Sequence, residues 1–248
     1  MGNSGEELDG NVNEATTVGR RLRISTRSGR IDVIAEDRAD IVVEKAGRRV
    51  EPDDDGSGRL TVTSRSTAVV ARVPLDTDVV VGSVSGRVSL SGRLGACGVT
   101  TVSGRVTVEA VESFEGRTGA GRLKVQTCAG RMRVDAGTGR VSIGSCGDLA
   151  VSAVSARVEV DSASGTLQVR TVSGRIAVTA TAEVPQVRAE SVSGRITVTL
   201  PAGVAPVQRY ASKAGSIGSD VPDGGDSQAG SVEARTISGS IRVRVQED

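Results

Sequence analysis

The chain has 248 residues, a formal net charge of +1, 37% hydrophobic residues and 25% charged residues, which is typical of a soluble globular protein. So small a net charge gives the whole molecule no strong attraction to polyanions. With one Phe, one Tyr and no Trp, any core must be filled by small aliphatic side chains, chiefly Val, whose branching at Cβ favours extended backbone. Histidine is absent, which excludes an imidazole base and His-based catalytic triads.

The first segment, residues 1–19, is polar and irregular, and we predict that it is disordered. It has neither a basic n-region nor an apolar h-region, so we do not expect a secretory signal. No run of about 18 apolar residues follows, so no membrane span is expected. As given, the chain is predicted to be cytoplasmic, although a chain from which a signal or anchor had been removed would look the same.

Residues 20–80 contain alternating segments in which every second residue is apolar, as in a half-buried strand. We interpret this region as the opening β coils and an N-terminal cap. The predicted strands are Arg21–Thr26, Arg30–Ala35, Asp40–Lys45, Leu60–Ser64 and Val69–Val73.

Residues 81–200 are dominated by one motif, Val-Ser-Gly-Arg-Val-x-Val. Its best copies are Val84–Leu90, Val102–Val108, Val172–Val178 and Val192–Val198. The glycine position recurs every eight or nine residues, with one double step over Glu112–Gly116. Nine residues suit a strand of about five residues and a turn of about four. Such a unit cannot bury its apolar face alone, whereas stacked units can.

The repeat therefore predicts an all-β fold, a single-stranded right-handed β-solenoid (β-helix) with irregular N- and C-terminal caps. Each coil would hold about 18 residues in two nine-residue strand-turn units. Glycine at the turn permits a positive φ, so Ala156 in this position must strain the backbone or change the turn type. Alternation predicts these inward pairs: Val88/Leu90, Val106/Val108, Leu123/Val125, Val141/Ile143, Val158/Val160, Leu167/Val169, Ile176/Val178 and Ile196/Val198.

The regular pattern breaks after Val198, at Leu200–Gly203. Residues 201–248 are predicted to form a C-terminal loop and closing strands, which end in a last copy of the motif, Ile237–Val243. Because the alternation never lapses for long, we predict that residues 20–248 form one continuous domain.

Four segments, together with the serial Ser-Gly-x-Val units, carry a resemblance to a known family. They are Ser28–Val33, Asp37–Val43, Val73–Val79 and Val198–Gly203. The chain resembles, over roughly residues 20–245, a bacterial family of β-strand-repeat proteins that are labelled candidate adhesins and have a toast-rack-like stacked sheet. The resemblance implies the fold. It implies no catalytic residues, and some relatives belong to membrane-stress modules.

An arginine follows the turn glycine in most copies of the motif, at steps of 17, 18 or 20 residues. The series is Arg87, Arg105, Arg122, Arg140, Arg157, Arg175 and Arg195. On a two-unit coil these residues would stack as a ladder with rungs about 4.8 Å apart. Such a ladder could bind an acidic polymer or another partner. It could equally consist of solvated side chains whose stems cover apolar surface.

Other chemistry has weaker support in the sequence. Cys97, Cys128 and Cys146 form no CxxC pair, so no metal site and no cofactor are predicted; they are interpreted as small buried side chains. Cys128 and Cys146 are one predicted coil apart and could be neighbours. The carboxylates Asp135, Glu159 and Asp161 could form a glycosidase-type pair, but acids on strand faces are usually solvated. Two GxG elements, at Gly119 and Gly137, do not open a helix, so they are not phosphate loops.

We therefore expect a non-catalytic interaction or scaffold protein that binds a protein or an acidic polymer. Nucleic acid is disfavoured because aromatic side chains for base stacking are missing. Two alternatives remain open at this stage. One is end-to-end self-assembly of the kind seen in bactofilin filaments, and the other is a carbohydrate-active β-helix enzyme.

Overall fold

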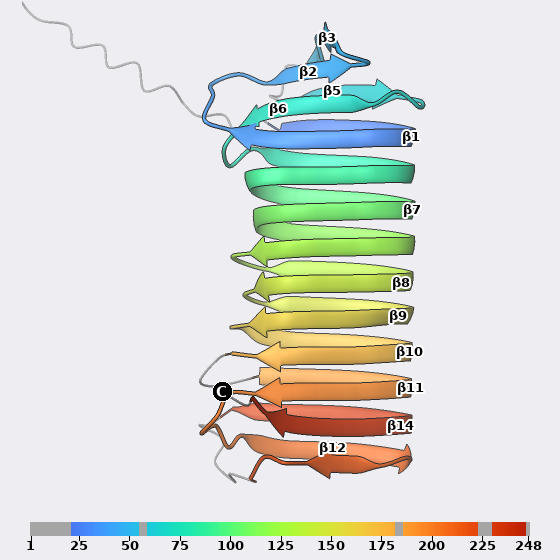
Figure 1. Cartoon of the computed structure of the whole chain (residues 1–248), viewed down its shortest axis with the longest axis vertical. Coiled ribbons are helices and arrows are strands. Elements are labelled where there is room, and N and C mark those ends of the chain that lie inside the picture. Colours follow the sequence, from blue (N-terminus) through green and yellow to red (C-terminus); the bar gives the residue numbers. More distant parts are fainter. Residues whose placement is uncertain (1–20, 55–58, 182–185, 223–229, 247–248) are drawn as a thin grey trace, which may run out of the picture.

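The molecule is a tall stack of β coils, as the computed structural model shows (Figure 1). The structure describes residues 21–54, 59–181, 186–222 and 230–246. The predicted disordered segment 1–19 lies outside these ranges. Within them all regular secondary structure is β, and the strands join in one sheet that winds around a common core. The predicted all-β solenoid is confirmed.

The strands differ greatly in length, because β7 runs through several coils without interruption. Their bounds are β1 Arg21–Glu36, β2 Val42–Lys45, β3 Arg48–Val50, β4 Asp53–Asp54, β5 Arg59–Ser64, β6 Val69–Pro74, β7 Asp78–Cys128, β8 Met132–Cys146, β9 Leu149–Ala163, β10 Thr166–Ala180, β11 Gln186–Leu200, β12 Val207–Ala214, β13 Ile217–Ser219 and β14 Ser231–Val245. Most predicted strands of the N-terminal region fall within β1, β2, β5 and β6.

The Ser-Gly-Arg motif is a bend inside a strand rather than a separate turn, which corrects the predicted nine-residue strand-turn unit. Strands β8 to β11 have 15 residues each and run through the motif. Parallel pairing continues there, as between Gly174 and Gly194. In Figure 1 the ribbons of β8 to β11 curve back at the right-hand edge and end in arrowheads at the left-hand edge, where short links join the coils. The two edges of the stack are therefore built differently.

A buried hydroxyl supports the bend from inside in several coils. Thr26 Oγ1 donates to the carbonyl oxygen of Ser28 at 3.1 Å, and Thr171 Oγ1 donates to that of Ser173 at 3.2 Å. Each donor lies two residues before the serine of the motif and faces the core. The bond satisfies the buried hydroxyl and ties it to the backbone of the bend.

Parallel pairing keeps equivalent residues of successive coils side by side. Val141 lies between Leu123 and Val158, and Ile196 lies between Ile176 and Ile241. All eight predicted inward pairs are buried, with at most 3% of any side chain exposed. The core is thus a set of aliphatic rows along the stack, as the alternation predicted.

The order of coils departs from the order of the chain at both ends of the stack. β1 lies between β7 on one side and β5 and β6 on the other. β14 enters between β11 and the final layer, which β12 and β13 form. The last motif of the chain, Ile237–Val243, therefore lies inside the stack and not at its end. Nothing in the local pattern of residues distinguishes this insertion from simple continuation.

The motif glycines form a column in which neighbouring backbones approach closely. At Gly139, φ is 118°, and a Cβ there would overlap the carbonyl oxygen of Gly121 in the adjacent coil. Such a φ strains any residue with a side chain. Ala156 occupies the same column without a positive φ, as Gly104, Gly121 and Gly194 do, so its backbone is not strained in the way that a positive φ would require.

We predict that Gly139→Ala lowers the free energy of unfolding by about 1–3 kcal/mol, because the new Cβ meets both an unfavourable φ and a carbonyl oxygen. The matched control is Gly98→Ala, whose Cβ would meet only Val80 methyl carbons at 3.7 and 3.9 Å. Chemical denaturation followed by circular dichroism measures both variants. Equal stability of the two variants would contradict the role of the column.

Candidate functional site

The predicted arginines lie in register along the edge where the strands bend. Arg140 pairs with Arg122 and Arg157, and Arg175 pairs with Arg157 and Arg195. The stacked glycines Gly86, Gly104 and Gly121 place Arg87 and Arg105 in the same series. All seven side chains are exposed. The ladder that the spacing predicted therefore exists as a geometric feature.

The ladder is one rung longer than the sequence indicated. Arg30 pairs directly with Arg87, and at the other end Ser240 lies beside Arg195, whose Nε donates to Ser240 Oγ at 3.4 Å. Arg30 is 57 positions before its neighbour, so a search for a step near 18 residues does not find it. With Arg30 included, the arginine ladder spans about 34 Å at the usual strand spacing.

Few carboxylates neutralise the arginine ladder. Arg30 Nε lies 2.6 Å from Asp32 Oδ2, and Arg157 Nε lies 3.9 Å from Glu159 Oε1. Within the described ranges, the remaining rungs have no acidic partner. Two unit charges 4.8 Å apart repel by about 0.9 kcal/mol even in bulk water. The ladder is therefore a row of mutually repelling cations that counter-ions or a bound anion would stabilise.

A furrow runs beside the arginines, because the glycine column leaves the bend without side chains. One hollow of about 570 Å³ is lined by Gly104, Gly121, Gly139 and the arginines from Arg105 to Arg157. The next, of about 700 Å³, begins at Arg157 and adds the motif serines, among them Ser173 and Ser193. One half of the furrow thus offers mainly guanidinium groups, and the other half adds hydroxyls.

An aliphatic ridge that sequence reasoning missed follows the same edge on the opposite side of the bend. Its members are 45–58% exposed and are Val84, Val102, Val154, Val172, Val192 and Ile237. They are the first residue of the motif, which points outward because the inward position comes one residue earlier. Gly119 and Gly137 interrupt the ridge, and a hollow of about 470 Å³ lies there. The sequence did contain a sign of this ridge. In each of these copies of the motif an apolar residue stands one position after an inward-facing residue, where alternation calls for an outward, polar one.

The three carboxylates considered for catalysis are not brought together. Asp135 lies in β8 before the bend, 3.8 Å from Arg117 and 3.7 Å from Arg133. Glu159 and Asp161 follow the bend in β9, on the other side of the coil. A retaining or inverting pair needs two carboxyl groups that face one substrate. Asp135 therefore does not face a substrate together with Glu159 and Asp161.

The cysteines are buried thiols. Cys128 and Cys146 are register neighbours, as their spacing suggested. Burial raises the pKa of Cys97 and of Cys146 to about 12, and it also raises the pKa of Cys128. Among the residues that the structure describes, no cluster of three or more Cys, Asp or Glu side chains could hold a metal ion. The same ranges contain no helix long and apolar enough to cross a membrane.

Comparison with known proteins identifies the family. A profile described as Toastrack DUF4097 matches residues 20–248, and the chain belongs to this family. One solved structure, a candidate cell adhesion protein from Clostridium sporogenes, aligns with 91% of this chain and 92% of its own at 7% identity and a TM-score of 0.24. Curated proteins give no match. The family name specifies neither an activity nor a ligand.

We predict that the native thiols do not react with an aromatic disulfide reagent at pH 8. At a pKa of about 12, only about one thiol in 10,000 is ionised at that pH. Denaturant should release all three. Thr127→Cys, exposed beside Cys128, is the positive control and should react at once. Rapid native labelling without this substitution would contradict the burial.

The raised pKa values of the buried thiols also make stability depend on pH. The free energy of unfolding should fall as pH rises from 9 towards 12, because only the unfolded thiols then ionise.

Proposed function

We propose that this chain is a non-catalytic binding module that holds a linear acidic polymer along the arginine ladder. The observation that carries the proposal is the ladder itself, eight in-register arginines of which only Arg30 and Arg157 have carboxylate partners among the described residues. A polymer with regularly spaced anionic groups would replace the counter-ions of several rungs at once. Release of those counter-ions favours binding and makes it sensitive to salt.

The furrow favours an extended ligand over a compact one. It continues from Gly104 to Ser240 through two hollows that share Arg157, and neither end closes around a small molecule. Guanidinium groups bind carboxylate, sulfate and phosphate oxygens in a bidentate manner. Serine hydroxyls in the second hollow suit the hydroxyl groups of a sugar.

An acidic polysaccharide fits the surface better than nucleic acid does. Single-stranded nucleic acids are bound through aromatic side chains on which bases stack. The only aromatic residues of the chain are Phe114, which is 3% exposed, and Tyr210, which lies in β12 at the end of the stack. Neither residue lines the furrow.

We predict that the protein is retained on heparin at low salt and that Arg105→Ser/Arg140→Ser/Arg175→Ser weakens the retention. Loss of three contacts should also make the slope of log K against log salt shallower by about 2–3. The matched control, Arg48→Ser/Arg209→Ser/Arg244→Ser, removes the same charge from exposed positions off the ladder that have no acidic partner among the described residues. Absence of retention at low salt, or an equal loss in both triple variants, would overturn the proposal.

Binding without cleavage is the second expectation. Prolonged incubation with heparin, alginate or polygalacturonate should leave the chain length of each polymer unchanged on size-exclusion chromatography, because the proposal assigns binding and no bond cleavage to this surface. Appearance of short fragments that copurify with the protein would reveal an enzyme. Sedimentation of the same samples over a range of protein concentrations tests the alternative of end-to-end assembly.

A further inference from the structure

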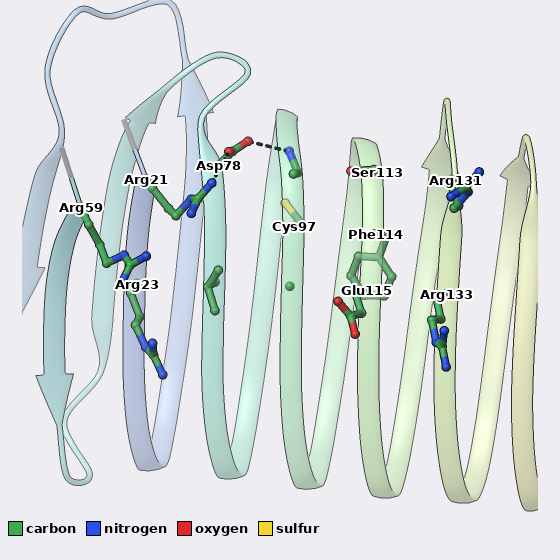
Figure 2. A pocket seen from close by; sticks show the side chains of 13 residues that line it. Arg21, Arg23, Arg59, Asp78, Cys97, Ser113, Phe114, Glu115, Arg131 and Arg133 are labelled. Atoms are coloured by element: carbon green, nitrogen blue, oxygen red, sulfur yellow. Dashed lines mark hydrogen bonds and ion pairs between the residues drawn. The ribbon is translucent and has the colours of Figure 1, made fainter. Parts of the chain in front are cut away.

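A second basic surface lies on one face of the stack, away from the arginine ladder and near the opposite edge. It is a hollow of about 610 Å³ whose lining includes five arginines and two carboxylates. Figure 2 shows Arg21, Arg23 and Arg59 at one end and Arg131 and Arg133 at the other. We call this hollow the saddle. It shares no residue with the ladder or its furrow.

The saddle is built from two rows of outward side chains that cross successive coils. The first row runs from Arg59 through Arg21 and Asp78 to Ala96 and ends at Ser113 and Arg131. The second row runs from Arg23 through Val80 and Gly98 to Glu115 and Arg133. From the coil of Arg21 to that of Arg131 there are four strand spacings, or about 19 Å. Small side chains in the middle make the depression.

Charge in the saddle is divided between its ends and its middle. Within the described ranges, the side chains of Arg23, Arg59 and Arg131 have no acidic partner, so both ends hold available guanidinium groups. The middle holds Asp78 and Glu115. Asp78 Oδ1 accepts from the backbone N–H of Ala96 at 2.9 Å, and Asp78 Oδ2 lies 3.6 Å from Arg21.

The second acid in the middle is also engaged, because Glu115 Oε1 accepts from Arg117 at 2.6 Å. Both carboxylates nevertheless keep the centre acidic or neutral while the ends are basic. A uniformly charged polyanion laid across the saddle would meet repulsion in the middle. A ligand with anionic ends and a neutral centre would meet none.

We propose that the saddle binds an acidic peptide segment whose carboxylates lie at its two ends, about six residues apart. At about 3.3 Å per residue, six extended residues span the 19 Å between the basic ends. Each carboxylate group would take a bidentate contact from an arginine. The neutral middle of the peptide would cross Ala96 and Gly98, where small side chains leave room for a backbone.

This site is independent of the proposed polymer site in both position and charge pattern. Ladder residues follow the bend in each coil, whereas saddle residues precede it. The ladder repeats one cation on every rung, but the saddle alternates from basic to acidic to basic within six coils. The two proposals can therefore fail separately.

The test compares two fluorescent peptides of identical composition with blocked termini. One has two aspartates at each end of a Ser-Gly-Ser-Gly centre, and the other has all four aspartates in the middle. Fluorescence anisotropy at low salt should show roughly tenfold tighter binding of the first peptide, which corresponds to about 1.4 kcal/mol. Equal affinity of the two peptides would overturn the proposal, because it would show charge attraction without a charge pattern.

Substitutions then locate the site. Arg23→Ser/Arg131→Ser removes one unpartnered arginine from each end and should abolish the preference. Arg209→Ser/Arg244→Ser and the ladder triple variant should both keep it. Matching thermal unfolding midpoints establish that each variant is folded. If the saddle variant keeps the preference, or if it weakens heparin retention as much as the ladder variant does, the saddle is not a separate peptide site.

Discussion

The fold depends on parallel pairing in strict register, which places equivalent residues of successive coils next to one another. Residues at one position of the motif therefore form a row along the stack, and side chains of the same kind lie next to one another in it. Rows of Val, Leu and Ile fill the core, and a column of glycines lets the bends approach closely enough for pairing to continue through them. Ala156 is the one non-glycine residue described in the arginine-bearing part of this column, and pairing continues in register on both sides of it.

Pairing in register also places charged side chains of the same sign next to one another. On a face of the stack acids between the arginines offset this repulsion, whereas on the bend edge they mostly do not. On one face, Arg188 lies 2.7 Å from Glu190 and 3.7 Å from Glu233. Burial raises the pKa of Glu190, but the hydrogen bonds and charges of Arg188 and Arg170 outweigh it and hold that pKa below its ordinary value. The face rows thus mix acids with bases. The arginine ladder has almost no such mixing, although Ser240 occupies the same bend position beside Arg195. The bend geometry does not demand arginine, so the fold alone does not explain the row.

What the sequence could reveal depended on whether a feature repeats at a constant step. The inward pairs and the ladder from Arg87 to Arg195 follow the period of the motif, and both were predictable. Arg30 and the position of β14 were not, because the chain reaches them by crossing a cap or a long connection, and local alternation carries no information about such crossings. The bend within a continuous strand was also missed, since Ser-Gly-Arg has the composition of a turn. The saddle joins Arg59, Arg21 and Arg131, whose sequence separations show no common period.

Repetition and its absence give the two basic surfaces different capacities for recognition. A ligand on the ladder can shift by one rung and recover nearly the same contacts, so the ladder gains strength from the number of rungs occupied rather than from a unique fit. The saddle cannot be shifted in this way, because moving a ligand by one coil places an anionic end against Asp78 or Glu115. Discrimination between ligands comes from such repulsive positions as much as from attractive ones. In this fold, selectivity between ligands is therefore expected at the saddle, where the repeat is broken. The ability to hold a long ligand is expected at the ladder, where the repeat is kept.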